Sequence, residues 1–203
     1  MSITLLIIIT TALISINAFK NRSLYHKLDF SPYQVIHRKE WHRLLSHVLL
    51  HGDGMHLFVN MFVLFSFGSS VENAFPDIFG KMGIFYYLLL YIGGAVFASL
   101  PSLKKHGNNP SYSAIGASGA VAAVLFANII LYPSNEIYIL FIPFGIPAFI
   151  FGPLYIGFEY YLDKKGGGNV AHDAHYWGAV FGFLFPIILK PNLFLNFVNQ
   201  IFG

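Results

Sequence analysis

The chain has 203 residues and a mass of 22.7 kDa, which is the size of a single domain. Hydrophobic residues make up 56% of it, charged residues only 10%, and the mean hydropathy is +0.61. Because a soluble domain carries about 25% charged residues, this composition excludes a disordered chain, a soluble enzyme and a nucleic-acid-binding module. The absence of cysteine excludes disulfides, a thiolate nucleophile and sulfur ligands for a metal, and the net charge of +3 is spread without a polybasic run.

About 20 apolar residues are needed for a helix to cross the roughly 30 Å of hydrocarbon in a membrane, and stretches of this length recur along the chain. We expect spans at residues 3–19, 55–75, 83–100, 114–132, 137–162 and 174–189. Lys20 and Arg22 follow the first stretch, and no basic region or A-x-A cleavage site marks it as a signal peptide, so we expect an anchored helix there. Short connections join the later spans, and the sequence therefore predicts an all-α, polytopic membrane protein with a compact six-helix bundle.

The fifth stretch is unusually rich in residues that interrupt helices. They are Pro143, Gly145, Pro147, Gly152, Pro153 and Gly157. Proline removes a backbone donor and glycine leaves the backbone soft. The pattern indicates either a kinked helix or a gate that moves to admit a ligand from the lipid, and the sequence leaves both interpretations open.

Polar side chains lie near the beginning of the second, fourth and sixth predicted spans, where burial in lipid is costly and indicates function. His56 and Asn60 are four residues apart and share a helix face, Ser118 lies near the start of the fourth span, and His175 lies near the start of the sixth. These three spans run in the same direction, so the three groups are predicted to lie on one side of the membrane at a similar depth.

Small residues repeat at every fourth position along the fourth and sixth predicted spans. The repeats are Gly119, Ala123 and Ala127 in the fourth span and Ala174, Gly178 and Gly182 in the sixth. Such repeats let helix backbones approach closely in lipid. If they face each other in parallel helices, Ser118 lies about 100° before its repeat and His175 about 100° after its own. Both side chains then point to the same side of the contact, as a nucleophile and its base would.

Taken singly, each of these groups has an ordinary structural explanation. A membrane serine commonly bonds back to a backbone carbonyl, and a His-x-x-x-Asn pair commonly holds two helices together. Their occurrence on one side of the membrane, together with the complementary small-residue repeats, favours a site over these explanations.

Several motifs, in their order along the chain, resemble those of the rhomboid family of intramembrane serine proteases. They are the run 43–51, His56 with Asn60, Gly116-Ala117-Ser118-Gly119, and Ala174-His175 followed by Gly178 and Gly182. The resemblance implies that Ser118 is the nucleophile and His175 its base, and that His56, Asn60 and the Ser118 backbone N–H stabilise the oxyanion. We expect structural support from Arg43, His51, Gly116, Gly119, Gly178 and Gly182. Trp and Arg are adjacent in the family's first loop, whereas His42 separates Trp41 from Arg43 here.

The resulting hypothesis is an intramembrane serine endopeptidase that cleaves transmembrane protein substrates through an acyl-enzyme. Asp173 would diverge from His175 on a helix, and the resemblance also implies a Ser-His dyad rather than a triad. The small-residue spacing begins beside His175 and favours it over His172 as the base. No cofactor or metal is predicted. The expected partners are a transmembrane protein substrate and the lipid bilayer, not nucleic acid, and the oligomeric state stays open.

Other classes of protein fit the sequence less well. A catalytically inactive rhomboid-like protein that binds membrane proteins would usually lack the serine or the histidine, and both are present. A His-rich metal-binding membrane protein could draw ligands from His47, His51, His56, His172 and His175. However, the chain has no H-E-x-x-H motif, and Asp53 is the only obvious carboxylate near these histidines in the sequence. A transporter would show interrupted helices in matching halves, and only the fifth stretch is interrupted.

Basic residues are distributed unevenly between the two sides of the predicted bundle. Ten lie on the side of the three polar groups and two, Lys81 and Lys190, on the other. The positive-inside rule would place the site toward the cytoplasm, whereas the resemblance implies an amino terminus inside and a site that opens outward. We follow the resemblance, because the connection 20–54 is typical of the membrane interface. We expect a multi-pass protein of a prokaryotic plasma (inner) membrane with its active site facing outward.

Overall fold

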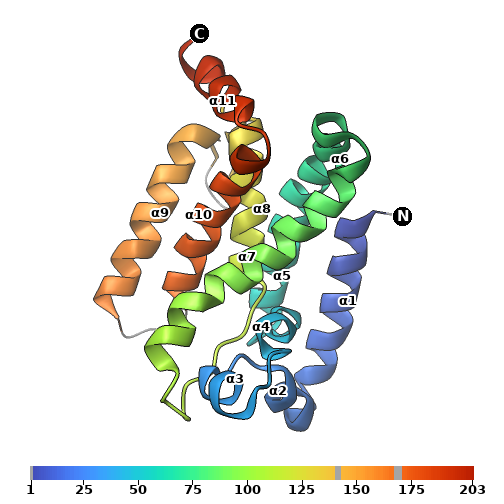
Figure 1. Ribbon diagram of the computed structural model, residues 1–203, viewed down its shortest axis with the longest axis vertical. Coiled ribbons are helices and arrows are strands. Elements are labelled where there is room, and N and C mark those ends of the chain that lie inside the picture. The colour runs from blue at the N-terminus through green and yellow to red at the C-terminus, as the bar shows by residue number, and fades with distance from the viewer. Residues whose placement is uncertain (1, 140–142, 167–170) are drawn as a thin grey trace.

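Figure 1 shows the computed structural model, which describes residues 2–139, 143–166 and 171–203, as a bundle of helices that lie side by side. In chain order its elements are α1 (Ile3–Ala18), α2 (Arg22–Leu28), α3 (Pro32–Arg38), α4 (Arg43–Ser46), η1 (His47–Leu49), α5 (Gly54–Val63), η2 (Leu64–Gly68), α6 (Ser69–Phe79), η3 (Gly80–Met82), α7 (Gly83–His106), α8 (Ser118–Leu131), β1 (Glu136–Ile137), β2 (Ile146–Pro147), α9 (Ala148–Lys165), α10 (His172–Leu189) and α11 (Asn192–Phe202). The segments η1 and η3 are 3-10 turns, and η2 is a π-helical segment that joins α5 to α6.

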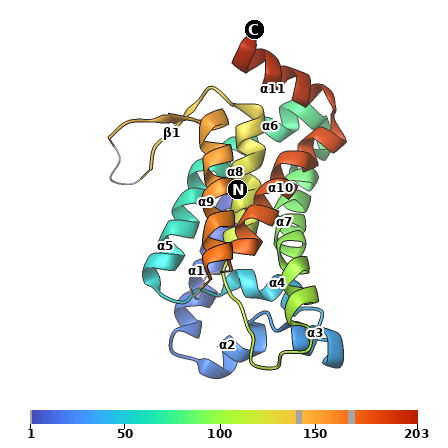
Figure 2. The ribbon, with the colours of Figure 1, turned by 90° about the vertical axis from the view of Figure 1, so that its left-hand side faces the viewer.

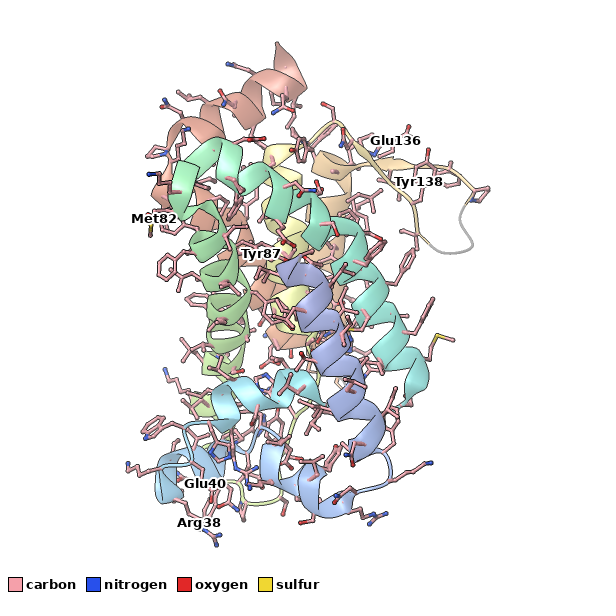
Figure 3. All side chains as sticks on the ribbon, turned by 90° about the vertical axis from the view of Figure 1, so that its right-hand side faces the viewer. Arg38, Glu40, Met82, Tyr87, Glu136 and Tyr138 are labelled. Atoms are coloured by element: carbon pink, nitrogen blue, oxygen red, sulfur yellow. The ribbon has the colours of Figure 1, made fainter. Side chains whose placement is uncertain are left out.

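The first connection, which contains α2, α3 and α4, lies at the opposite end of the bundle from the hairpin formed by β1 and β2. Figure 3 shows Arg38 and Glu40 at one end, Glu136 and Tyr138 at the other, and Tyr87 of α7 between them. Helices α8 and α10 both begin on the side of the first connection (Figure 1). The polar groups at their N-terminal ends are therefore brought to the same side of the bundle, as the sequence predicts.

Helix α8 forms the centre of the bundle. Every residue from Gly119 to Leu131 is buried, and other helices lie on all sides of it (Figure 2). A helix that is apolar all round is typical of such a central position, because it has no face to offer to water. The position of Ser118, as the first residue of α8, is thereby determined by packing on several sides.

The small-residue repeats of α8 and α10 face each other, as the sequence predicts. A Cβ atom on Gly178 would lie 2.2 Å from the carbonyl oxygen of Gly119, and one on Gly182 would lie 2.0 Å from that of Ala123. From the first contact to the second, the residue number rises by four on both helices, so the two helices are parallel. A Cβ on Gly94 of α7 would likewise lie 2.5 Å from the Cβ of Ala123, so α8 is in close contact with α7 as well.

Length and composition identify few membrane-crossing helices in the described parts of the chain. One helical run, Gly54–His106, which comprises α5 to α7, is long and apolar enough. Helices α10 and α11 pass the same test only as a pair that is bent by 112°, and α1 and α8 are apolar but shorter than a full span. The expected count of six spans therefore stays a prediction, while the helical bundle itself is present.

The fifth predicted span is wrong in its first part. Residues 137–162 do not form one helix, because α9 begins only at Ala148 and a short antiparallel hairpin precedes it. In this hairpin Glu136 is opposite Pro147 and Ile137 is opposite Ile146. Figure 2 shows the hairpin projecting away from the bundle. Pro147 is the N-cap residue of α9, where a missing N–H costs nothing, whereas Pro153 lies inside the helix and removes one of its backbone donors.

Gly178→Ala tests the close approach of α8 and α10. The added Cβ would lie 2.2 Å from a backbone oxygen, so the helices must separate. Overpacking costs typically about 1–3 kcal/mol, and we expect the free energy of unfolding in detergent micelles to fall by at least that amount. Gly157→Ala in α9 is the matched control, because its Cβ meets nothing within 4 Å and alanine favours the helix. Equal losses in the two variants would contradict the proposed role of the contact.

Candidate active site

Gly116 shapes the backbone that leads into Ser118. Its φ of 118° lies in a region that side chains rarely allow. A Cβ there would lie 3.2 Å from the Nε2 atom of His56 and 3.7 Å from the Oγ atom of Ser118. The glycine thus lets the chain pass between these two side chains, and its own N–H donates to the carbonyl oxygen of His47 at 3.1 Å.

Ser118 and His175 are in direct contact. The Oγ atom of Ser118 lies 2.7 Å from the Nε2 atom of His175, which is a short hydrogen bond between the first residue of α8 and the first turn of α10. The side chain of His175 is only 15% exposed. The structure therefore joins these two predicted residues, and their separation suits the transfer of a proton from a hydroxyl to an imidazole.

His56 lies close to this pair, whereas Asn60 makes a different contact. The Nδ1 atom of His56 accepts a hydrogen bond of 3.4 Å from the backbone N–H of Gly52, so its proton is on Nε2, the atom that faces Gly116. The Asn60 amide donates to the carbonyl oxygen of His56, one turn earlier on the same helix, at 3.1 Å. In the described part of the chain, no hydrogen bond joins Asn60 to Ser118.

A buried carboxylate that the sequence analysis missed lies beside His175. Glu159 of α9 places its Oε2 atom 3.0 Å from the Nδ1 atom of His175, on the side of the ring away from Ser118. The contact is within ion-pair distance but lacks the alignment of a hydrogen bond. Glu159 is the only charged residue between positions 148 and 162, and a lone carboxylate in an apolar helix is the signal that indicates function.

Asp173, which is nearer in the sequence, does not contact His175. Its carboxylate accepts hydrogen bonds from the Ser102 hydroxyl at 3.1 Å and from the N–H of Ala174 at 3.0 Å. It therefore stabilises the N-terminus of α10 and its packing against α7, which agrees with the expectation that Asp173 and His175 diverge.

His172 shares the carboxylate of Glu159. Its Nδ1 atom lies 2.7 Å from Oε2 in a well-aligned hydrogen bond. Glu159, His172 and His175 are the one group of possible metal ligands within the described residues, since their ligand atoms lie within 4.8 Å of one another. Ligands around a tetrahedral zinc ion are about 3.3 Å apart for bonds of about 2.0–2.1 Å, so the distances here are those of hydrogen bonds, and an ion would have to spread the three side chains.

A polar cavity of about 180 Å³ lies at the loop end of the bundle, next to the site. It is formed where α7 and α9 end and α10 begins, and polar side chains line most of it. They are Lys105, His106, Tyr112, Asp163, His172 and Asp173. A cavity of this size and polarity accommodates water molecules.

Residues of the first connection support the chain around the site. The buried guanidinium of Arg43 donates to the carbonyl oxygens of His26 at 2.9 Å and Asp29 at 2.8 Å, and to the Glu40 carboxylate at 2.6 Å. The carbonyl oxygen of His47, in the same connection, accepts a hydrogen bond from the backbone N–H of Gly116 and so fixes the segment before Ser118. His42, the residue that departs from the family pattern, bonds to the carbonyl oxygen of Lys27 at the surface.

His51 links the first connection to α1. Its Nδ1 atom lies 2.9 Å from the hydroxyl of Ser15, which itself donates to the carbonyl oxygen of Leu49. The hydroxyl therefore accepts from His51, which must carry its proton on Nδ1. The His51 ring also packs edge-on against His56, with ring centroids 4.9 Å apart.

The fold and the site define an apolar helical bundle in which a serine and a histidine meet between two closely packed helices. Residues 38–192 match the family model of the Rhomboid domain. RHOMBOID-like protein 12, mitochondrial, of Arabidopsis thaliana is 33% identical over 151 residues, which cover 68% of this chain and 43% of that protein. Rhomboid protease GlpG of Haemophilus influenzae is 25% identical over 171 residues, which cover 84% of this chain and 82% of that protein. Rhomboid protease GluP of Bacillus subtilis is 29% identical over 150 residues, which cover 73% of this chain and 26% of that protein.

The chain belongs to the rhomboid family of membrane proteins, which includes intramembrane serine proteases. It spans 43% of the length of the Arabidopsis relative and 52% of a mitochondrial rhomboid protein of Schizosaccharomyces pombe. Because mitochondrial proteins are among its relatives, the expected location in a prokaryotic plasma membrane is not supported.

The buried histidines of the first connection predict that acid destabilises the protein. Burial lowers the pKa of His47 to about 4, and burial together with the nearby His56 lowers the pKa of His51 to about 3. In the unfolded chain both have the ordinary pKa of about 6.5. Below that pH the unfolded state binds more protons, so the free energy of unfolding falls as the pH falls, by about 1.4 kcal/mol per unit for each group.

Denaturation in detergent at a series of pH values between 7 and 4.5 measures this slope. We expect His47→Gln to reduce the slope, and His37→Gln, which replaces an exposed histidine, to leave it unchanged. A His47→Gln variant with the slope of the original protein would show that His47 is not buried as a neutral group.

Proposed function

We propose that the protein is an intramembrane serine endopeptidase that cleaves transmembrane protein substrates. The observation that carries this proposal is the distance of 2.7 Å between the Ser118 hydroxyl and the His175 ring nitrogen. Membership of the rhomboid family supports it, since two relatives are named as rhomboid proteases. An inactive binding protein would not need this contact.

In the proposed acylation step, His175 removes the proton from Ser118 as the Oγ atom attacks the scissile carbonyl carbon. The resulting oxyanion needs hydrogen-bond donors that are already in place. The backbone N–H of Ser118 is one, because the first N–H groups of a helix have no partner within it. The Nε2–H of His56 is another, since Gly52 holds the opposite ring nitrogen as the acceptor.

Collapse of the tetrahedral intermediate breaks the peptide bond. The proton on His175 passes to the leaving amine, and the acyl group stays on Ser118 as an ester. His175 then removes a proton from water, which attacks the ester, and the proton returns to Ser118 as the acid product leaves. The polar cavity beside the start of α10 offers a route by which that water reaches the site.

A fluorophosphonate probe tests whether Ser118 is an activated nucleophile. We expect the purified protein to be labelled at Ser118 and to cleave a model transmembrane substrate, because His175 is placed to remove the hydroxyl proton. Ser118→Ala and His175→Ala should abolish both labelling and cleavage while the proteins stay folded. Ser113→Ala, in the loop before the site, is the matched control that keeps activity. Cleavage by the Ser118→Ala variant would refute the proposed function.

His56→Ala tests the proposed oxyanion site. Loss of one such donor typically lowers kcat by about 10²- to 10³-fold, and we expect a loss in this range with KM little changed. Asn60→Ala should cost less, because its amide already bonds to the carbonyl oxygen of His56. Both constants are measured on the same transmembrane substrate. A larger loss for Asn60→Ala than for His56→Ala would assign the principal donor to Asn60 instead.

A further inference from the structure

Glu159 is a buried carboxylate for which the serine–histidine pair alone provides no role. It is 8% exposed and lies on the face of α9 that packs against α10. An uncompensated carboxylate in an apolar environment is costly. The compensation here comes from His172 and His175, whose Nδ1 atoms lie 2.7 Å and 3.0 Å from the same oxygen, Oε2.

This arrangement determines which nitrogen of His175 carries the proton. A carboxylate only accepts hydrogen bonds, so an imidazole that faces it is favourable with a proton on Nδ1 and unfavourable with a lone pair there. With the proton on Nδ1, the Nε2 atom of His175 is free to accept from the hydroxyl of Ser118, at 2.7 Å. In the opposite tautomer, Nε2 would carry the proton and His175 could not act as the base.

We propose that Glu159 is a positioning residue for His175, which holds the imidazole in the tautomer and orientation that activate Ser118. The proposal rests on the proposed protease function and deepens it: Ser118 and His175 remain the catalytic dyad, and Glu159 of α9 acts on Ser118 only through His175. No extra proton transfer is needed. When His175 takes the proton of Ser118, the carboxylate remains ionised and faces the new imidazolium charge.

His172 completes the arrangement from the other side. Its aligned hydrogen bond of 2.7 Å holds Oε2 in place, whereas the 3.0 Å contact with His175 is less directional. The shared oxygen therefore stays next to His175 while that ring changes its charge. His172 acts on the carboxylate and not on Ser118, which makes it the matched control for the test.

The test compares Glu159→Gln, Glu159→Asp and His172→Gln with the original protein in detergent. For each variant, kcat and KM on a transmembrane substrate and the rate of fluorophosphonate labelling are measured. We expect Glu159→Gln to lower kcat and the labelling rate by about 10- to 1,000-fold, with KM little changed. This loss is smaller than the roughly 10⁴-fold loss of kcat that follows when the acid of a well-aligned serine protease triad is replaced by its amide. Glu159→Asp should restore part of the loss, because it keeps the charge on a shorter side chain. His172→Gln should cost less than Glu159→Gln.

Three results would overturn the proposal. Glu159→Gln with full kcat would show that the carboxylate is not needed. Equal losses in His172→Gln and Glu159→Gln, without rescue by Glu159→Asp, would indicate that the carboxylate only holds α9 against α10. Activity of the original protein that is lost on chelation and restored by zinc would make the three side chains metal ligands.

The failure of this proposal differs from the failure of the proposed function. If the original protein is labelled at Ser118 and Glu159→Gln is labelled equally fast, the function stands and only the role of Glu159 is rejected. If the original protein neither reacts with the probe nor cleaves a substrate, both proposals are rejected together.

Discussion

The close approach of the α8 and α10 backbones is the constraint on which the site depends. Gly178 lets α10 lie directly against the carbonyl oxygen of Gly119, and a side chain at position 178 would push the two helices apart, whereas one at position 119 would first meet Ala98 of α7. Helices in lipid gain little from hydrophobic burial against each other, so such packing decides how they associate. Ser118 precedes this contact by one residue and His175 by three, so the separation of the backbones determines whether their side chains can meet.

Helix α9 is bound to the bundle less extensively than α8. It buries only Ala148, Gly152 and Glu159, whereas α8 is buried along nearly its whole length. Movement of α9 away from α10 would take Glu159 from its histidines but would leave the contact between α8 and α10 in place. The two interpretations of the fifth stretch, a kinked helix and a gate, thus predict different positions for the Glu159 carboxylate. In a static kinked helix the carboxylate always faces His175, whereas in a gate it would do so only in the closed state.

Contacts that follow from regular helical spacing were predictable from the sequence, and contacts that depend on the rotation of a helix were not. The four-residue repeats predicted that Ser118 and His175 meet, and they do. Glu159 was visible as a lone charge in an apolar stretch, but its direction depends on how α9 turns about its own axis. The hairpin before α9 was missed because apolar strand residues such as Ile137 and Ile146 look the same as those of a buried helix.

The shortness of α8 explains how a proposed hydrolytic site can lie within a membrane bundle. Its 14 residues extend about 21 Å, less than the roughly 30 Å of hydrocarbon that a full span crosses. The irregular backbone before Ser118 is held by hydrogen bonds with Phe30 and His47. Such backbone is tolerated within a membrane only where protein buries it or a water-filled cavity faces it. Of the backbone before Ser118, Gly116 and Ala117 are buried in protein, and Tyr112 lines the polar cavity beside α10. Under the proposed function, the same short length that keeps α8 from counting as a full span would place Ser118 below the membrane surface.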